Sequence, residues 1–213
     1  HVSRSTGISA AGGLSVGWGT VFGDYDRDGD EDIFVGNGHV VRYPKNSPLQ
    51  QPPLVLMNQE QKRFVDVAAQ AGGYTAAAHM SRGVAQADLD GDGDLDLVVS
   101  HVNQPAAILR NDTPATGSWL ELELVGVASP RWAEGAWVEC QVGDQRLLRL
   151  KKGGTSYAST SGRPLHWGFG EPARIDRLVI HWPSGQVDEY QDVLVNQRLT
   201  VVEGRPRLLV KAP

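Results

Sequence analysis

The sequence predicts an all-β chain, with two related units of short strands followed by a β-sandwich or a barrel-like domain. Turn residues are abundant, with 25 glycines and 12 prolines among 213 residues, and they bound short runs rich in β-branched residues. Part of the first half of the chain is repeated. Apolar residues make up 40% of the sequence, which is enough to bury hydrophobic cores. No apolar run approaches the ~18 residues of a membrane-spanning helix.

The repeated unit has the order strand, acidic loop, strand, turn, strand, and it occurs twice before Asn111. The matching segments are Gly19–Asp24 with Gly83–Asp88, Asp32–Val35 with Asp96–Val99, and Val55–Asn58 with Ile108–Asn111. The first copy is longer by a Pro-rich stretch, Val40–Pro53, which we expect to be a surface loop. Between the copies, Phe64–Val67 alternates like one more strand, and the two glycines of Ala68–Ala78 favour a loop over a helix.

The composition changes after Asn111. Residues 112–118 have the Thr, Pro, Gly and Ser content of a linker. Trp119–Val125 then alternates apolar and polar residues, as a strand with one buried face does. Further strands are predicted at Trp137–Val142, Gln145–Leu150, Ile175–Trp182, Val187–Tyr190 and Leu199–Glu203. We therefore divide the chain into a repeat region at 1–111, a linker at 112–118 and a C-terminal β domain at 119–213.

The acidic residues concentrate in two short loops. Residues 24–32 hold six acidic residues with Arg27 as the only base, and residues 88–96 hold five acidic residues and no base. The whole chain has a formal net charge of −5, so the rest of it is net positive. Crowded carboxylates repel one another, and a divalent cation is the usual remedy. A solvated acidic segment is the alternative, but such segments lack the glycines and flanking apolar strands found here.

Each loop has the side-chain spacing of a calcium-binding loop. Aspartates occupy positions 1, 3 and 5, glycine at position 6 permits a sharp turn, position 7 offers its carbonyl and an aspartate follows at position 9. Ca²⁺ prefers such flexible shells of carboxylate and carbonyl oxygens. The predicted metal ligands are Asp24, Asp26, Asp28, Asp30 and Asp32 in the first loop and Asp88, Asp90, Asp92, Asp94 and Asp96 in the second. The sequence thus predicts two Ca²⁺ sites, with Mg²⁺ or metal-free acidic turns as alternatives.

The residues after the loops distinguish them from EF-hands. An EF-hand loop continues to a glutamate at position 12 and then a helix. Position 12 is Val35 in one loop and Val99 in the other, and both lie in β-branched runs typical of strands. A cage built from one short loop leaves little room for a substrate, and a metal-bound carboxylate is held ionised, unlike a catalytic acid. We therefore predict a structural metal and no catalytic residues.

The loops with their flanking strands resemble FG-GAP/VCBS repeats, the blades of integrin-type β-propellers. The region from Trp119 to Glu203 resembles the ASPIC/UnbV domain. That second resemblance rests on the motifs Gly135–Val138, Ser156–Ser159, Leu165–Gly170, Ile180–Gly185 and Val195–Gln197. It implies two blades and a secreted or extracellular, calcium-dependent recognition role with an extracellular protein or glycan as partner.

The resemblance also implies a larger assembly, because a propeller needs about four to eight blades. The chain is then expected to be the C-terminal end of a longer propeller protein, or to cover its open blade face with another chain. Some proteins of this type are encoded near enediyne biosynthesis genes. An accessory protein or enzyme of such a pathway is therefore the alternative, and it requires a pocket at the junction of the two domains.

Weaker signals add little to these two hypotheses. Trp132 follows Ser129–Arg131 in an expected loop and is the aromatic residue best placed to touch a ligand. Cys140 is the only cysteine and is most simply a small buried residue. A basic cluster around Lys151 and Lys152 is too small to indicate nucleic-acid binding.

Overall fold

The computed structural model describes residues 2–41, 45–114, 117–171 and 174–211. Within these ranges the regular secondary structure consists of strands in several open sheets and one short helix, α1 (Ile8–Gly12). The all-β fold class is therefore confirmed. No helix in the described ranges is long and apolar enough to cross a membrane.

The first sheet has the strand order β1-β2-β3-β4 and is antiparallel throughout. Its strands are β1 (Gly17–Gly23), β2 (Asp32–Asn37), β3 (Leu54–Gln59) and β4 (Arg63–Asp66). The acidic loop 24–32 connects β1 to β2, as the repeat predicts. The Pro-rich segment between β2 and β3 is a connection outside the sheet, although residues 42–44 lie outside the described ranges.

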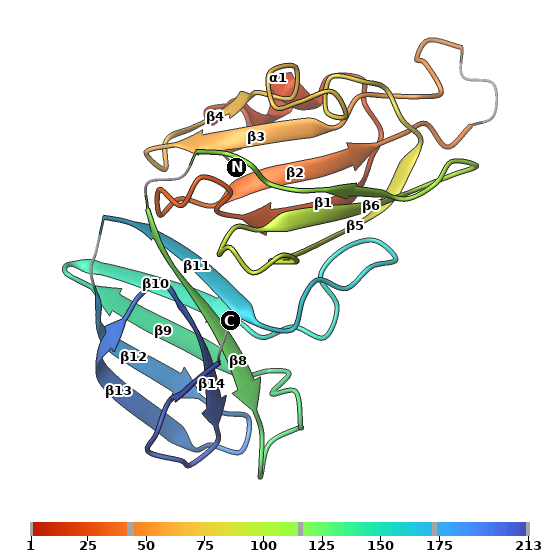
Figure 1. Ribbon diagram of the computed structural model, residues 1–213. Coiled ribbons are helices and arrows are strands. Elements are labelled where there is room, and N and C mark those ends of the chain that lie inside the picture. Colours follow the sequence, from red (N-terminus) through yellow and green to blue (C-terminus); the bar gives the residue numbers. More distant parts are fainter. Residues whose placement is uncertain (1, 42–44, 115–116, 172–173, 212–213) are drawn as a thin grey trace.

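The second sheet repeats the first three strands of this arrangement. It has the order β5-β6-β7, with β5 (Ser81–Ala87), β6 (Asp96–His101) and β7 (Ala107–Leu109). The acidic loop 88–96 connects β5 to β6. Figure 1 shows β1 and β5 side by side, so that the first strands of the two sheets are neighbours. A shared buried cluster that includes Phe34, Val84 and Val99 lies between the sheets.

The C-terminal strands form two further open sheets, one with the order β10-β9-β12-β13 and the other with the order β11-β8-β14-β15. Their bounds are β8 (Ser118–Val125), β9 (Trp137–Val142), β10 (Gln145–Leu150), β11 (Leu165–Gly170), β12 (Arg174–His181), β13 (Val187–Leu194), β14 (Gln197–Val202) and β15 (Leu209–Val210). Pairing is antiparallel except between β8 and β14, which run parallel. Of the two architectures predicted, the open sheets favour the sandwich over the barrel.

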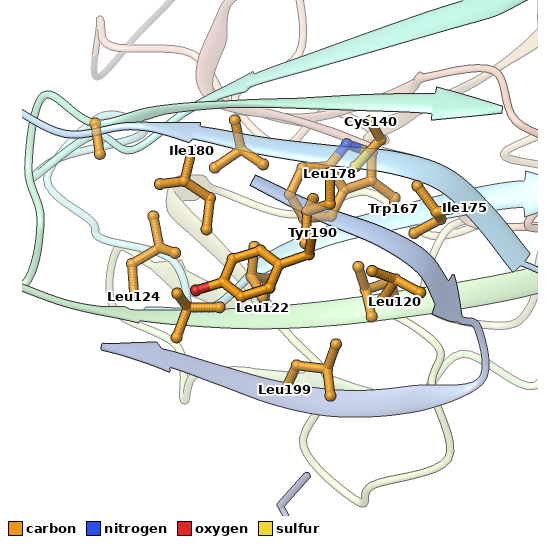
Figure 2. Packing of buried hydrophobic residues seen from close by; sticks show 14 of the residues in the cluster. Leu120, Leu122, Leu124, Cys140, Trp167, Ile175, Leu178, Ile180, Tyr190 and Leu199 are labelled. Carbon is orange, nitrogen blue, oxygen red and sulfur yellow. The ribbon is translucent and has the colours of Figure 1, made fainter. Parts of the chain in front are cut away.

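One hydrophobic core fills the space between these two sheets. Figure 2 shows side chains from both sheets pointing toward one another around Trp167. Leu120, Leu122 and Leu124 alternate with half-buried polar residues along β8, which is the period-two pattern expected for that strand. Cys140 is fully buried in the same core, as predicted, and burial raises the pKa of its thiol to about 12.

The structure differs from the sequence prediction in a few elements. The helix α1 and the strand β15 were not predicted, and β11 appeared only as a motif of the resemblance. Short elements such as these carry little periodicity, so pairing partners decide them. Ala68–Ala78 contains turns and no helix, as its glycines suggested. The linker 112–118 includes residues 115 and 116, which lie outside the described ranges, and Ser118 already belongs to β8.

The connection between β10 and β11, Lys151–Pro164, lies against the repeat region. Its Ser156 hydroxyl accepts a hydrogen bond from the Thr20 amide at 2.8 Å, and its Ser159 hydroxyl donates to the Val84 carbonyl at 2.6 Å. The Gly162 amide donates to the Gln86 carbonyl at 2.7 Å. These bonds satisfy backbone groups on the free edges of β1 and β5, which would otherwise lack partners in a sheet.

Candidate functional site

The two acidic loops have closely similar backbones. Gly29 and Gly93, at position 6 of each loop, have φ angles of 98° and 93°. A residue with a β-carbon is strained in that region, so the glycines permit the turn that the spacing requires. In both loops the amide of this glycine donates to the aspartate at position 1, from Gly29 to Asp24 and from Gly93 to Asp88, at 2.9 Å each.

The aspartates at position 9 fasten the loops to their sheets. Asp32 accepts hydrogen bonds from the amides of Tyr25 and Asn58, at 3.0 and 2.7 Å. Asp96 accepts the equivalent bonds from Leu89 and Asn111, at 2.9 and 2.8 Å. Both side chains thus join the start of the loop to the third strand of the repeat, or to the segment just after it. The donors are backbone amides, and the side chains of Asn58 and Asn111 donate to the carbonyls of Glu31 and Tyr25.

The carboxylates at positions 1, 3 and 5 of each loop come together. One ligand oxygen from each of Asp24, Asp26 and Asp28 lies within 4.8 Å of the others, and Asp88, Asp90 and Asp92 form an equivalent group. These two clusters could hold a metal ion. Oxygen-only ligand sets of this kind suit hard cations such as Ca²⁺ and Mg²⁺.

The remaining predicted ligands make other contacts. Asp30 accepts a hydrogen bond from the Gln61 amide at 3.0 Å, and Asp94 pairs with Arg27. Asp32 and Asp96 are occupied by amides, as described above. The Oδ1 atom of Asp26, in contrast, is buried and has no hydrogen-bond partner. A buried carboxylate oxygen without a donor is costly, and a cation at the cluster would satisfy it.

The first loop is electrostatically strained without a cation. Burial, together with the neighbouring carboxylates, raises the pKa of Asp24 to about 8 and that of Asp32 to about 7. In the second loop, burial raises the pKa of Asp94 to about 6, against the opposing effect of Arg27. Raised pKa values mean that the folded chain resists full ionisation of these groups. A bound divalent cation would hold them ionised.

Two arginines near the loops form ion pairs with carboxylates of the second loop. Arg27, at position 4 of the first loop, has a φ of 58° and reaches across to the second loop, where its Nε lies 3.0 Å from Asp94 Oδ1. Arg198 of β14 lies 2.6 Å from Asp88 and 2.6 Å from Glu121. The second loop therefore receives two guanidinium groups. The sequence predicted neither the contact of Arg27 nor that of Arg198 with the second loop, because each joins residues that are far apart in the chain.

The C-terminal domain packs directly against both loops. A β-carbon on Gly168 of β11 would collide with Asp24 Oδ2, so only glycine fits beside the first loop. The Nε2 atom of His166 lies 2.9 Å from the Gly93 carbonyl in the second loop. Burial lowers the pKa of His166 to about 4, so the ring is neutral at pH 7 and donates to that carbonyl.

A cleft of about 750 Å³ lies beside the loops, between the repeat region and the C-terminal sheets. The repeat region contributes Phe22 and Gln86, and the C-terminal part contributes Trp137, the β10 side chains and much of Lys151–Pro164. Glu31 and Arg149, which form an ion pair at 3.2 Å, come from opposite sides. The alternative function required a deep pocket with a polar lining at this junction, and the structure contains a cleft there that polar and apolar side chains line together.

Comparison with known proteins shows that part of the chain matches a protein family. Residues 126–207 match the family model described as "ASPIC and UnbV". The matched region includes β9 to β14, the connection Lys151–Pro164 and the wall of the cleft that they form. The ASPIC/UnbV part of the sequence resemblance is therefore supported.

The curated relatives are vertebrate proteins named "Cartilage acidic protein 1". The human protein is 24% identical over 168 residues, and the Xenopus tropicalis protein is 29% identical over 109 residues. These matches cover 77% and 49% of this chain, but only 24% and 16% of the relatives. The chain thus spans about a quarter or less of the length of the proteins that it matches.

Proposed function

We propose that the protein is a calcium-binding, non-catalytic extracellular recognition or adhesion module, and the C-terminal part of a longer β-propeller protein. In this proposal the two N-terminal sheets are FG-GAP/VCBS-type blades, and each acidic loop holds one Ca²⁺ ion. An extracellular protein or glycan is the partner. Further blades, or another chain, lie against the open blade face.

The observation that carries the proposal is the duplicated cluster of three aspartates with a buried, unpartnered oxygen at Asp26. The two loops share their turn glycines and the hydrogen bonds of their first and ninth aspartates, which supports a common function. The likeness to cartilage acidic protein and the ASPIC/UnbV match support the extracellular assignment. Ca²⁺ fits better than Mg²⁺ because the loops are flexible shells of carboxylates without a rigid octahedral frame.

Calorimetry in metal-free buffer tests the calcium sites. We expect heat of calcium uptake at two sites in the wild type and at one site in Asp26→Ala or Asp90→Ala. Asp112→Asn is a matched control, because this carboxylate is exposed and pairs only with Arg110 outside the loops. Absence of calcium uptake by the wild type would sink the proposal.

A second experiment tests recognition. Binding to extracellular matrix proteins and to glycans is measured with calcium and with a chelator, using the wild type and Asp26→Ala. The proposal expects a partner whose binding weakens when calcium is removed. Calcium uptake without any partner would leave only a structural role for the metal.

The cleft favours one alternative function, an accessory protein or enzyme of natural-product biosynthesis of the enediyne type. The observation behind it is the cleft at the domain junction, whose lining includes polar side chains outside the acidic loops, such as Gln86, Thr155 and Ser161. This function predicts binding of a small organic molecule that persists in chelator, whereas the recognition module predicts a macromolecular partner that requires calcium. Binding of small organic molecules and of matrix proteins, each measured with calcium and with chelator, therefore separates the two.

A further inference from the structure

The connection Lys151–Pro164 brings three cationic side chains to the cleft: Lys151, Lys152 and Arg163. In the parts of the chain that the structure describes, none of them has an ion pair. Of the other charged groups that line the cleft, Glu31 pairs with Arg149, and Asp88 and Glu121 share the single guanidinium of Arg198. The three cations of Lys151–Pro164 are therefore the cleft charges without an ion pair among the described residues.

Lys151 is an unusual member of this group because it is buried. Its residue is only 7% exposed, and its ammonium donates to the Arg163 carbonyl. An ammonium has three donors, so one carbonyl leaves two of them without a described acceptor. Burial lowers the pKa of Lys151, and the charges of Glu134 and Glu123 only partly oppose this effect.

Arg163 is held in place by an aromatic ring. Its guanidinium lies 3.6 Å from the ring centroid of Trp132, which is 37% exposed. Stacking on a ring fixes the planar guanidinium, and less conformational freedom is then lost when it binds a carboxylate. Trp132, which the sequence indicated as the aromatic residue best placed to touch a ligand, thus positions the Arg163 side chain that lines the cleft.

Partly exposed apolar side chains also line the cleft, Phe22 from the repeat region and Leu148 and Leu150 from β10 on the side of the cations. Phe22 is 55% exposed, and Leu148 and Leu150 are 51% exposed each. Apolar side chains exposed in a concave site favour a ligand with an apolar body. A cleft of about 750 Å³ is of the size that holds small organic ligands.

We propose that this cleft binds a small amphipathic carboxylate. The carboxylate of the ligand contacts Lys151, Lys152 and Arg163, and its aromatic or aliphatic body lies against Phe22 and the β10 leucines. This inference goes beyond calcium binding and does not depend on it, because none of the three cations touches an acidic loop. It gives a ligand class to a region that the proposed recognition function leaves without a role.

A titration with 1-naphthoate, followed by amide chemical shifts, tests the inference, with uncharged 1-naphthamide as the comparison ligand. We expect shifts at Gly162 and at neighbouring amides of the cleft. We expect naphthamide to bind at least about tenfold more weakly, because it lacks the charge-assisted hydrogen bonds. Equal binding of both compounds, or shifts confined to other surfaces, would overturn the inference.

Variants test which charged side chains bind the carboxylate of the ligand. Lys152→Gln combined with Arg163→Gln should weaken naphthoate binding about tenfold, since both side chains are exposed and their loss spares the fold. Arg131→Gln is the control: it removes one guanidinium from beside Trp132, but Arg131 does not line the cleft. Unchanged binding in the double variant contradicts the proposal. Calcium calorimetry on the same samples shows separately whether the acidic loops work.

Discussion

The protonation and the contribution to stability of a buried carboxylate in this protein depend on the hydrogen-bond donors around it. Glu203 directly follows β14. One of its oxygens, Oε2, accepts hydrogen bonds from the amides of Val127, Ala128 and Ser129, at 2.6, 2.8 and 2.8 Å. Its other oxygen accepts from the hydroxyls of Ser129 and Ser184. Burial opposes its ionisation, but these hydrogen bonds prevail and lower its pKa to about 2. Asp26 stands in contrast, with a buried oxygen that has no donor.

The contacts of Glu203 predict that Glu203→Gln destabilises the C-terminal domain by about 1–3 kcal/mol, because the amide cannot accept all these bonds. The folded pKa is below the unfolded value of 4.5. The wild-type contribution is therefore complete above that value and lost as the pH falls toward about 2. Urea unfolding at pH 7 and at pH 3 measures this. Glu189→Gln is the control, because Glu189 is an exposed residue of β13, and an equal loss in both variants would contradict the prediction.

At the scale of the element, the two loops differ in how much of their charge is already neutralised. Arg27 and Arg198 both pair with carboxylates of the second loop, Asp94 and Asp88. We therefore predict that the first loop binds calcium more tightly. Calorimetry on Asp90→Ala, which keeps the first loop, and on Asp26→Ala, which keeps the second, should show affinities that differ by about five- to tenfold.

Removing Arg198 extends this prediction. Arg198→Gln in the Asp26→Ala background should strengthen calcium binding by the second loop, because Asp88 loses a competing cation. Arg177→Gln is the control, since its partner Glu189 lies on the other C-terminal sheet, away from the loops. Weaker binding after removal of Arg198 would show that this arginine positions Asp88 for the metal instead of competing with it.

The elements also show what the sequence can and cannot predict. Strong periodicity or repetition located β8, β9 and β10 and both acidic loops within a residue or so, because these patterns are local. The cleft, Arg198 and the hydrogen bonds of Ser156 and Ser159 to β1 and β5 depend on contacts between residues far apart in the chain. Gly168 is similar: only the position of Asp24 above β11 explains why a side chain is excluded there.

For the whole molecule, the acidic loops link calcium, pH and stability. Asp24 and Asp32 have folded pKa values of about 8 and 7, above their ordinary value of 3.8. Between pH 3.8 and about pH 8, these two groups bind more protons in the folded chain than in the unfolded chain. Without metal, the stability that these groups contribute is present at low pH and is lost as the pH rises toward 8.

We therefore predict that, in chelator, the metal-free protein melts at a lower temperature at pH 8 than at pH 5.5. The difference should be on the order of 2 kcal/mol, or about 4–8 °C. Saturating calcium should remove or reverse this trend, because the ion binds the deprotonated folded state and displaces protons from it. Thermal unfolding at both pH values, with chelator and with calcium, measures the effect. Identical pH trends in the two buffers would mean that calcium does not bind the carboxylates whose burial costs the fold stability.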